Sequence, residues 1–273
     1  MSHVLTIRFW GTRGGTAVPG SSMQRYGGNT SCIELRCGEH LLILDAGTGL
    51  RPLGDTLVGS EVDADLLLTH THLDHIGGLG FFEPLTRSGT QLRLHGGHLP
   101  AMELRAALAA ALSPPLMPEL WKLISGKLSV DTLPTGRPTE LHAGLRVGAE
   151  RLRHPGGAVG FRIEWQGRSV AYVTDTEHQP GALDPAVLRL ARDTDIFIYD
   201  SNYTDEEFPH RVGWGHSTWQ EGVRLANAAG ARTLVLFHHD PWRSDAQIDM
   251  IAQAAAAARP GTVAAAEGVV LTA

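Results

Sequence analysis

The stretch "LLLTHTHLDHIGG", residues 66–78, places three histidines and an aspartate within six positions after an apolar run. In extended backbone, side chains two residues apart project to the same side, so His70 and His72 converge on one point. Asp74 and His75 follow where the chain turns toward a helix, and they point to a second place nearby. Imidazole and carboxylate ligands suit zinc, and also manganese or iron. The spacing therefore predicts two divalent metal ions about 3.5–4 Å apart, as in two-metal hydrolases.

Each ion needs more ligands than this motif supplies, and three later residues are candidates. His154 ends "AERLRH", Asp175 ends "SVAYVTD" and His238 ends "RTLVLFH", so each follows a predicted strand. A side chain at the tip of a strand is held by the sheet while it faces the loops. A lone histidine in this position is more often a structural residue, so on the residues alone both interpretations stay open.

The predicted strands come in clusters that single helices separate, which favours two stacked sheets with external helices over one doubly wound sheet. The sequence contains no linker, charge block or repeat, which predicts a single domain of residues 1–273. Its segment at about 100–126 is apolar and alanine-rich, and we expect a helical, lid-like insertion there. Strands are predicted at 4–10, 31–36, 40–44, 65–69, 91–95, 145–153, 160–165, 169–174, 195–199, 232–237, 262–266 and 268–272, and helices at 185–192, 218–229 and 245–259.

Composition and charge exclude several classes of protein. The formal net charge of −6 repels phosphate backbones, so extended nucleic acid is not an expected partner. Cys32 and Cys37 lie five residues apart and would face opposite sides of a strand, which argues against a disulfide between them. No secretory signal is visible, and no apolar run reaches the ~18 residues of a membrane span. We therefore expect a cytoplasmic protein without a membrane partner.

The order "HTHLDH", His154, "TDT" at Asp175 and His238 resembles the metallo-β-lactamase superfamily over nearly the whole chain. The resemblance implies an α+β fold, a four-layer αβ/βα sandwich of two mixed sheets with external helices. It implies two divalent ions, most often Zn2+, with Mn2+ or Fe as alternatives, and a hydroxide between them as the nucleophile. It also implies the ligand sets: His70, His72 and His154 for the first ion, Asp74, His75 and His238 for the second, and Asp175 as the bridge.

Two further segments narrow the resemblance to one branch. "FIYDSNYT" ends a strand at Asp200, and "GWGHST" places His216 in a loop before a helix. Both resemble the acid and the histidine loop of ribonuclease Z-like phosphodiesterases, whose acid is usually glutamate. The resemblance implies catalytic roles for Asp74, Asp200 and His216, with His216 giving a proton to the leaving oxygen. The alternative for His216 is a residue that only precedes a helix cap.

The doublet in "FHHDP" leaves a choice of ligand. The family pattern places the ligand at the first histidine after the strand, which selects His238. We expect His239 to point the other way, toward substrate, with Asp240 as its partner. Near the other end of the chain, Gly11, Gly14 and Gly15 permit either a tight turn or a close approach of backbone to the site.

The sequence therefore predicts a hydrolase for a small or cyclic phosphodiester. The pattern is similar to that of bacterial proteins likened to cyclic-nucleotide phosphodiesterases. One alternative is a transfer-RNA 3′-processing endonuclease, but that branch carries a basic Gly/Pro-rich arm that this sequence lacks. A lactone, thioester or β-lactam hydrolase shares the metal core and is a second alternative. A metal-bound scaffold without activity is a third, and a homodimer is left open.

Overall fold

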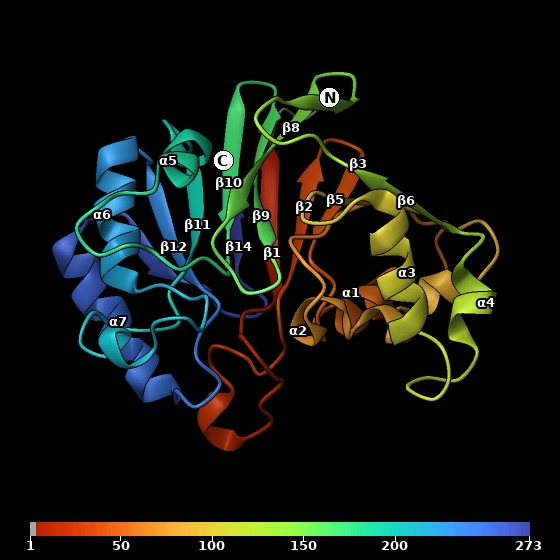
Figure 1. The fold of residues 1–273 in the computed structure, drawn as a ribbon, viewed down its shortest axis with the longest axis horizontal. Coiled ribbons are helices and arrows are strands. Elements are labelled where there is room, and N and C mark those ends of the chain that lie inside the picture. The colour runs from red at the N-terminus through yellow and green to blue at the C-terminus, as the bar shows by residue number, and fades with distance from the viewer. Residues whose placement is uncertain (1–3) are drawn as a thin grey trace.

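Two seven-stranded sheets pack face to face in the computed structural model, which describes residues 4–273 (Figure 1). Residues 1–3 of the predicted domain lie outside this range. The strand order is β14-β1-β2-β3-β4-β5-β6 in the first sheet and β13-β12-β11-β10-β9-β8-β7 in the second. Strands β3 to β6 and β10 to β13 run parallel, whereas the other pairs are antiparallel. The prediction of two mixed sheets with external helices is confirmed.

The secondary-structure elements have the following bounds. The first sheet contains β1 (Leu5–Gly11), β2 (Cys32–Cys37), β3 (His40–Leu44), β4 (Asp63–Leu67), β5 (Gln91–Gly96), β6 (Leu128–Thr132) and β14 (Val270–Thr272). The second contains β7 (Thr139–His142), β8 (Leu145–Leu152), β9 (Ala158–Trp165), β10 (Arg168–Val173), β11 (Ile196–Asp200), β12 (Thr233–Phe237) and β13 (Thr262–Ala264). The α-helices are α1 (Leu50–Thr56), α2 (Leu73–Ile76), α3 (Ala101–Ala111), α4 (Leu120–Ile124), α5 (Pro185–Ala191), α6 (Trp219–Ala229) and α7 (Asp245–Ala258).

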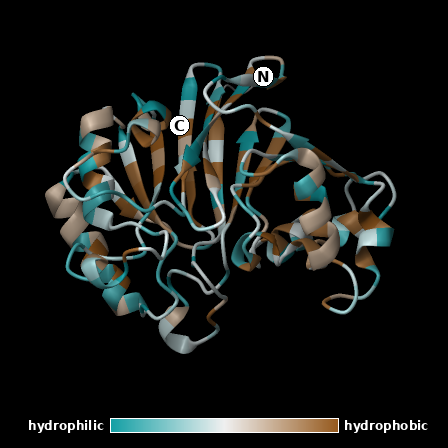
Figure 2. Ribbon diagram, viewed as in Figure 1, coloured by the Kyte–Doolittle hydropathy of each residue, from teal (hydrophilic) through white to brown (hydrophobic). Residues whose placement is uncertain are grey.

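Three hydrophobic clusters hold these layers together. The cluster between the sheets contains Phe9, Phe161 and Phe237, all fully buried. A second cluster packs the outer face of the first sheet against α1 and α3, for example through Leu104. A third packs the second sheet against α5, α6 and α7, for example through Leu225. Because side chains alternate between the two faces of a strand, each sheet contributes residues to two of these clusters. Figure 2 accordingly shows the strands rich in hydrophobic residues, while the loops are mostly hydrophilic or intermediate.

Several local predictions agree with the structure. Cys32 and Cys37 are free and belong to different hydrophobic clusters, so they face opposite sides of β2 as expected. The left-handed Gly230 ends α6, as a glycine after a helix favours. The sequence analysis missed α1, β6 and β7. Helix α1 contains Pro52 and Gly54, and the two strands are short with half-exposed polar residues, so none shows a clear periodic pattern.

The predicted helical segment at about 100–126 contains α3 and α4. Its residues Leu104, Leu108 and Ile124 are fully buried in the cluster on the outer face of the first sheet. This packing places α3 and α4 at the flank of the molecule (Figure 1). A role as a lid stays a prediction. Within residues 4–273, no helix combines the length and the apolar character that crossing a membrane requires.

The chain direction of the strands brings their polar ends to one edge. Parallel strands β10, β11 and β12 end together, and β8 shares their direction because β9 is antiparallel to both neighbours. In the first sheet, β3 and β4 also end side by side. Residues that directly follow these strands therefore lie in the loops at one edge of the sandwich, although up to about 200 positions separate them.

We expect Phe161→Ala to lower the free energy of unfolding by about 3–5 kcal/mol, because it leaves a cavity between the sheets. The matched control is Phe81→Ala, since Phe81 is 59% exposed and its loss should cost less than about 0.5 kcal/mol. Urea denaturation followed by circular dichroism measures both. Equal losses in the two variants would show that the inter-sheet cluster is not the main source of stability.

Candidate active site

Seven histidine and aspartate side chains from both sheets meet at this edge. They form two groups, and within each group the ligand atoms lie within 4.8 Å of one another. The carboxylate of Asp175 faces both. Its Oδ1 lies 3.8 Å from Nε2 of His70 and of His154, and its Oδ2 lies 3.2 Å from His75 and 3.3 Å from His238. The first group consists of His70, His72 and His154, and the second of Asp74, His75, Asp175 and His238.

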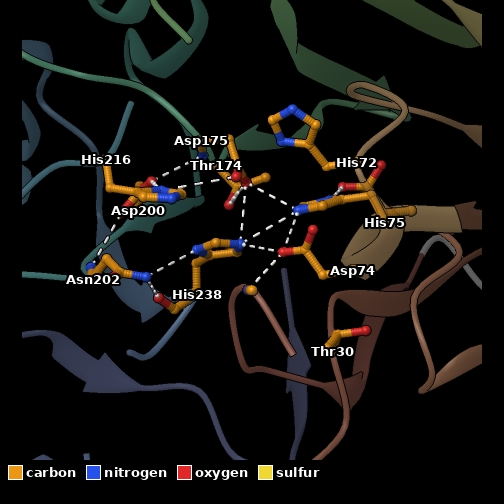
Figure 3. A network of polar contacts seen from close by, with 12 residues as sticks. Thr30, His72, Asp74, His75, Thr174, Asp175, Asp200, Asn202, His216 and His238 are labelled. Carbon is orange, nitrogen blue, oxygen red and sulfur yellow. Dashed lines mark hydrogen bonds and ion pairs between the residues drawn. The ribbon is translucent and has the colours of Figure 1, made fainter. Parts of the chain in front are cut away.

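The second group is the more tightly packed. The Nε2 atoms of His75 and His238 are 3.3 Å apart, and both lie within 3.4 Å of Asp74 Oδ2. Figure 3 shows Asp74, His75, Asp175 and His238 pointing toward one another. In the first group, His72 Nδ1 and His154 Nε2 are 3.0 Å apart. Imidazole nitrogens that converge in this way on carboxylate oxygens form the ligand set of a divalent cation.

The residues present fit such cations. His70 Nε2 is buried and has no hydrogen-bond partner among residues 4–273, although a buried polar atom normally has one. His75 and His238 use their Nδ1 atoms for other contacts, which leaves both Nε2 atoms facing the two carboxylates. Burial alone would raise the pKa of Asp175, but the imidazoles of His238, His75 and His70 hold that pKa well below its ordinary value. The carboxylate is therefore ionised and available to a cation.

A buried aspartate that the sequence analysis missed orients the second group. Asp45 follows β3 and accepts a hydrogen bond of 2.8 Å from His75 Nδ1. It also accepts hydrogen bonds from the Thr69 amide and from the Tyr172 hydroxyl, both at 2.8 Å. Such a partner fixes the ring and the tautomer of a metal-binding histidine. One feature could have identified Asp45 as a site residue. It lies at the end of a strand, and that strand lies beside the one that precedes His70.

Asn202 is a second residue that sequence reasoning missed. Its Nδ2 donates to the His238 carbonyl at 3.0 Å and lies 3.3 Å from His238 Nδ1. The residue lies two positions after Asp200, the last residue of β11, in the loop that follows this strand. Nothing in its spacing distinguishes it from an ordinary loop asparagine, because its partner lies 36 residues further along the chain.

The N-terminal glycine loop approaches the site closely. The Gly15 amide donates to Asp74 Oδ2 at 2.7 Å. A Cβ added to Gly14 would lie 2.3 Å from the His238 ring, so only glycine fits there. Arg13 anchors the loop, because its buried guanidinium donates to the carbonyls of Gly27 and Arg243. The sequence left open whether these glycines permit a tight turn or a close approach of backbone to the site, and at Gly14 the structure shows the close approach.

Asp200 and His216 lie beside the two groups. Asp200 Oδ2 is 3.0 Å from His216 Nδ1 and also accepts the Asp175 amide at 2.9 Å. Burial lowers the pKa of His216, but the adjacent Asp200 outweighs it and raises the pKa to about 9. Thr218 caps α6 by accepting from the Glu221 amide, so His216 does precede a helix cap, but its ring also contacts Asp200. His216 Nδ1 lies 3.8 Å from Asp175 Oδ1.

The structure corrects one expectation about the histidine doublet. His238 lies in the second group, whereas His239 points away from it as expected. However, His239 does not face a substrate: it is buried, with Nε2 2.9 Å from the Ala265 carbonyl, and its ring contacts Tyr26 edge-on. Asp240 is not its partner and instead accepts the Trp242 amide. The reason is packing, since the loop after β12 turns His239 into the protein interior.

Comparisons with known proteins support these observations. Residues 40–239 match the family model described as the beta-lactamase superfamily domain. Ribonuclease Z from Myxococcus xanthus is 25% identical over 260 residues, covering 77% of this chain and 81% of that protein. Two solved structures, the metallo-beta-lactamase fold protein YhfI from Bacillus subtilis and a diphosphatase from the PhnP family, each superpose with a TM-score of 0.72 at 19% identity. The match to YhfI covers 100% of both chains, and the match to the diphosphatase covers 98% of this chain and 97% of that chain.

The solved structures confirm the four-layer αβ/βα fold that the resemblance implied. The family model spans β3 to the residue after His238, so it includes both ligand groups and the Asp200–His216 pair. From the family match, the ribonuclease Z relatives and the donor set, it follows that this chain belongs to the β-lactamase superfamily, in its ribonuclease Z-like branch, and is a metal-dependent hydrolase.

Proposed function

We propose that this protein hydrolyses a phosphodiester bond in a small or cyclic nucleotide-type substrate. One observation carries the proposal: Asp175 presents one carboxylate oxygen to each ligand group, next to the Asp200–His216 pair. This arrangement combines two cation sites with a proton donor. Relatives named ribonuclease Z and a similar structure named diphosphatase are consistent with chemistry at phosphorus.

His70, His72 and His154 would hold one cation, Asp74, His75 and His238 the other, and Asp175 both. Zinc suits these ligands best, with manganese or iron as alternatives. When bound, two such cations would supply a water molecule of lowered pKa as the nucleophile and would neutralise charge on the phosphoryl oxygens. Asp74 would contribute beyond binding: its Oδ2 accepts the Gly15 amide and lies near His75 and His238, so Oδ1 could orient the attacking water.

His216 would protonate the departing oxygen. The raised pKa that Asp200 gives His216 favours the protonated imidazole that an acid needs. Asp200 keeps the imidazole in place and favours its charged form. The family's usual acid is the longer glutamate, but here the aspartate reaches His216 at 3.0 Å, and the Asp175 and Asn202 amides hold its carboxylate at the end of β11.

The second candidate function is 3′ processing of transfer RNA, which the ribonuclease Z relatives favour. The net charge of −6 argues against it, since an RNA surface is usually basic. Incubation of the zinc-loaded protein with a precursor transfer RNA carrying a 3′ trailer distinguishes the two. Under our proposal, cleavage of the trailer is at least a hundredfold slower than hydrolysis of a cyclic nucleotide.

His216→Ala should slow the hydrolysis of a 2′,3′-cyclic nucleotide by about 10²–10⁴-fold, because an alkoxide leaving group needs a proton. Bis-p-nitrophenyl phosphate has a phenolate leaving group that needs little protonation, so its rate should fall by less than about tenfold. Steady-state kinetics on both substrates measure the contrast, and turnover of p-nitrophenyl acetate tests for a carboxyl-ester hydrolase. Equal losses for both diesters would show that His216 does not act as the acid.

His238→Ala and His239→Ala form a matched pair for the metal site. We expect the purified wild-type protein to contain two metal ions, the His238→Ala variant to lose at least one, and the His239→Ala variant to keep both. Inductively coupled plasma mass spectrometry counts the ions, and circular dichroism confirms that both variants are folded. Full metal content in the His238→Ala protein would contradict the assigned ligand set.

A further inference from the structure

A cavity of about 380 Å³ lies next to the candidate metal site and takes no part in the chemistry described above. The cavity shares His154 with that site: Nε2 of His154 faces the first ligand group, whereas Nδ1 lies 2.8 Å from the Gly215 carbonyl, which also lines the cavity. A substrate bound at the ligand groups therefore has this hollow directly beside it. The other lining residues that matter here are Arg153, Pro155, His178, Phe208 and Val212.

One wall of the cavity is aromatic. The rings of His178 and Phe208 stack with centroids 4.0 Å apart and an interplanar angle of 27°. His178 Nδ1 is 2.8 Å from Ser217 Oγ, which in turn contacts the Tyr199 hydroxyl at 2.9 Å. Among residues 4–273, His178 Nε2 has no hydrogen-bond partner, and it is not enclosed in the protein. One polar atom of a fixed, flat ring is thus available to a ligand in the cavity.

The cavity is formed before any ligand binds. The Glu177 carboxylate accepts the amides of Gly213 and Gly215 at 2.7 and 2.9 Å, and the Glu177 amide donates to the Arg153 carbonyl. These bonds join the loop after β10 to the loop that carries His216 and to the end of β8. The Arg153 guanidinium is about half exposed and lies 4.0 Å from Asp184, which leaves its donors accessible. Binding to this cavity needs little rearrangement.

We propose that this cavity binds the nucleoside part of the substrate while the phosphodiester lies at the ligand groups. A hollow of this size accepts one small molecule. Its apolar and aromatic lining suits the flat face of a nucleobase, which stacks on aromatic side chains whatever its identity. A base stacked on this wall leaves the accessible donors of Arg153 for the sugar or a second phosphate. This inference rests on the proposed function and makes a single nucleotide unit the recognised substrate class.

The first test compares two diesters with the same leaving group, thymidine 5′-(p-nitrophenyl phosphate) and methyl p-nitrophenyl phosphate. The wild-type enzyme loaded with zinc should prefer the nucleoside diester by at least tenfold in kcat/KM. Val212→Trp narrows the cavity from its exposed rim and should reduce this preference at least tenfold, mainly through KM. The control Val58→Trp changes a half-exposed valine outside the cavity and should leave the preference unchanged. A preference that Val212→Trp does not alter would overturn the proposal.

The second test does not depend on turnover. Adenosine, which lacks a phosphate, should bind the metal-free protein in isothermal titration, and Val212→Trp should weaken this binding at least tenfold. Ribose 5-phosphate should compete at least tenfold more weakly than adenosine. Absence of adenosine binding, or equal binding by both proteins, refutes the nucleoside cavity. A third outcome separates the two proposals. If Val212→Trp abolishes adenosine binding but the enzyme hydrolyses neither diester, the nucleoside cavity is supported and the proposed reaction is refuted.

Discussion

The carboxylate of Asp175 is the interaction on which the rest of the site depends. Its two oxygens face the two ligand groups, and its backbone amide donates to Asp200, which holds His216. One residue therefore links both cation sites to the proton donor. Because this residue follows β10 in the middle of the second sheet, its position is fixed by pairing with a strand on each side. Movement of Asp175 would disturb all three parts at once.

The site stores backbone strain around its charged groups. Asp45, Asp175 and His238 each adopt a left-handed conformation, with φ of 59°, 55° and 59°, within two residues of the end of a strand. A non-glycine residue in this region costs of order 1–3 kcal/mol and persists only where the surroundings enforce it. Here the enforcement is visible as hydrogen bonds from Thr69 and Tyr172 to Asp45, and from Asn202 to the His238 carbonyl. The same conformation turns each side chain from the sheet toward the loops.

The two sheets contribute different residues to the site at the edge that they share. The first supplies the compact motif after β4 together with Asp45, whereas the second supplies His154, Asp175, Asp200 and His238 from four separate strands. Neither sheet has a complete ligand set alone, so the inter-sheet cluster around Phe161 and Phe237 is also what assembles the site. The cavity beside His154 is lined by loops of the second sheet, so this sheet provides cation ligands and, under the proposal, also recognises the rest of the substrate.

Features that depend on local spacing in the chain could be predicted before the structure was known. Period-two alternation predicted that His70 and His72 converge, and the clusters of strands predicted two sheets with external helices, because both follow from near neighbours in the chain. The tertiary structure decided the contacts between distant segments: Asp45 with His75, Asn202 with His238, and the aromatic wall of His178 and Phe208. It also decided that His239 enters the core. These outcomes depend on how the two sheets pack and where each loop returns, which no short stretch of sequence encodes.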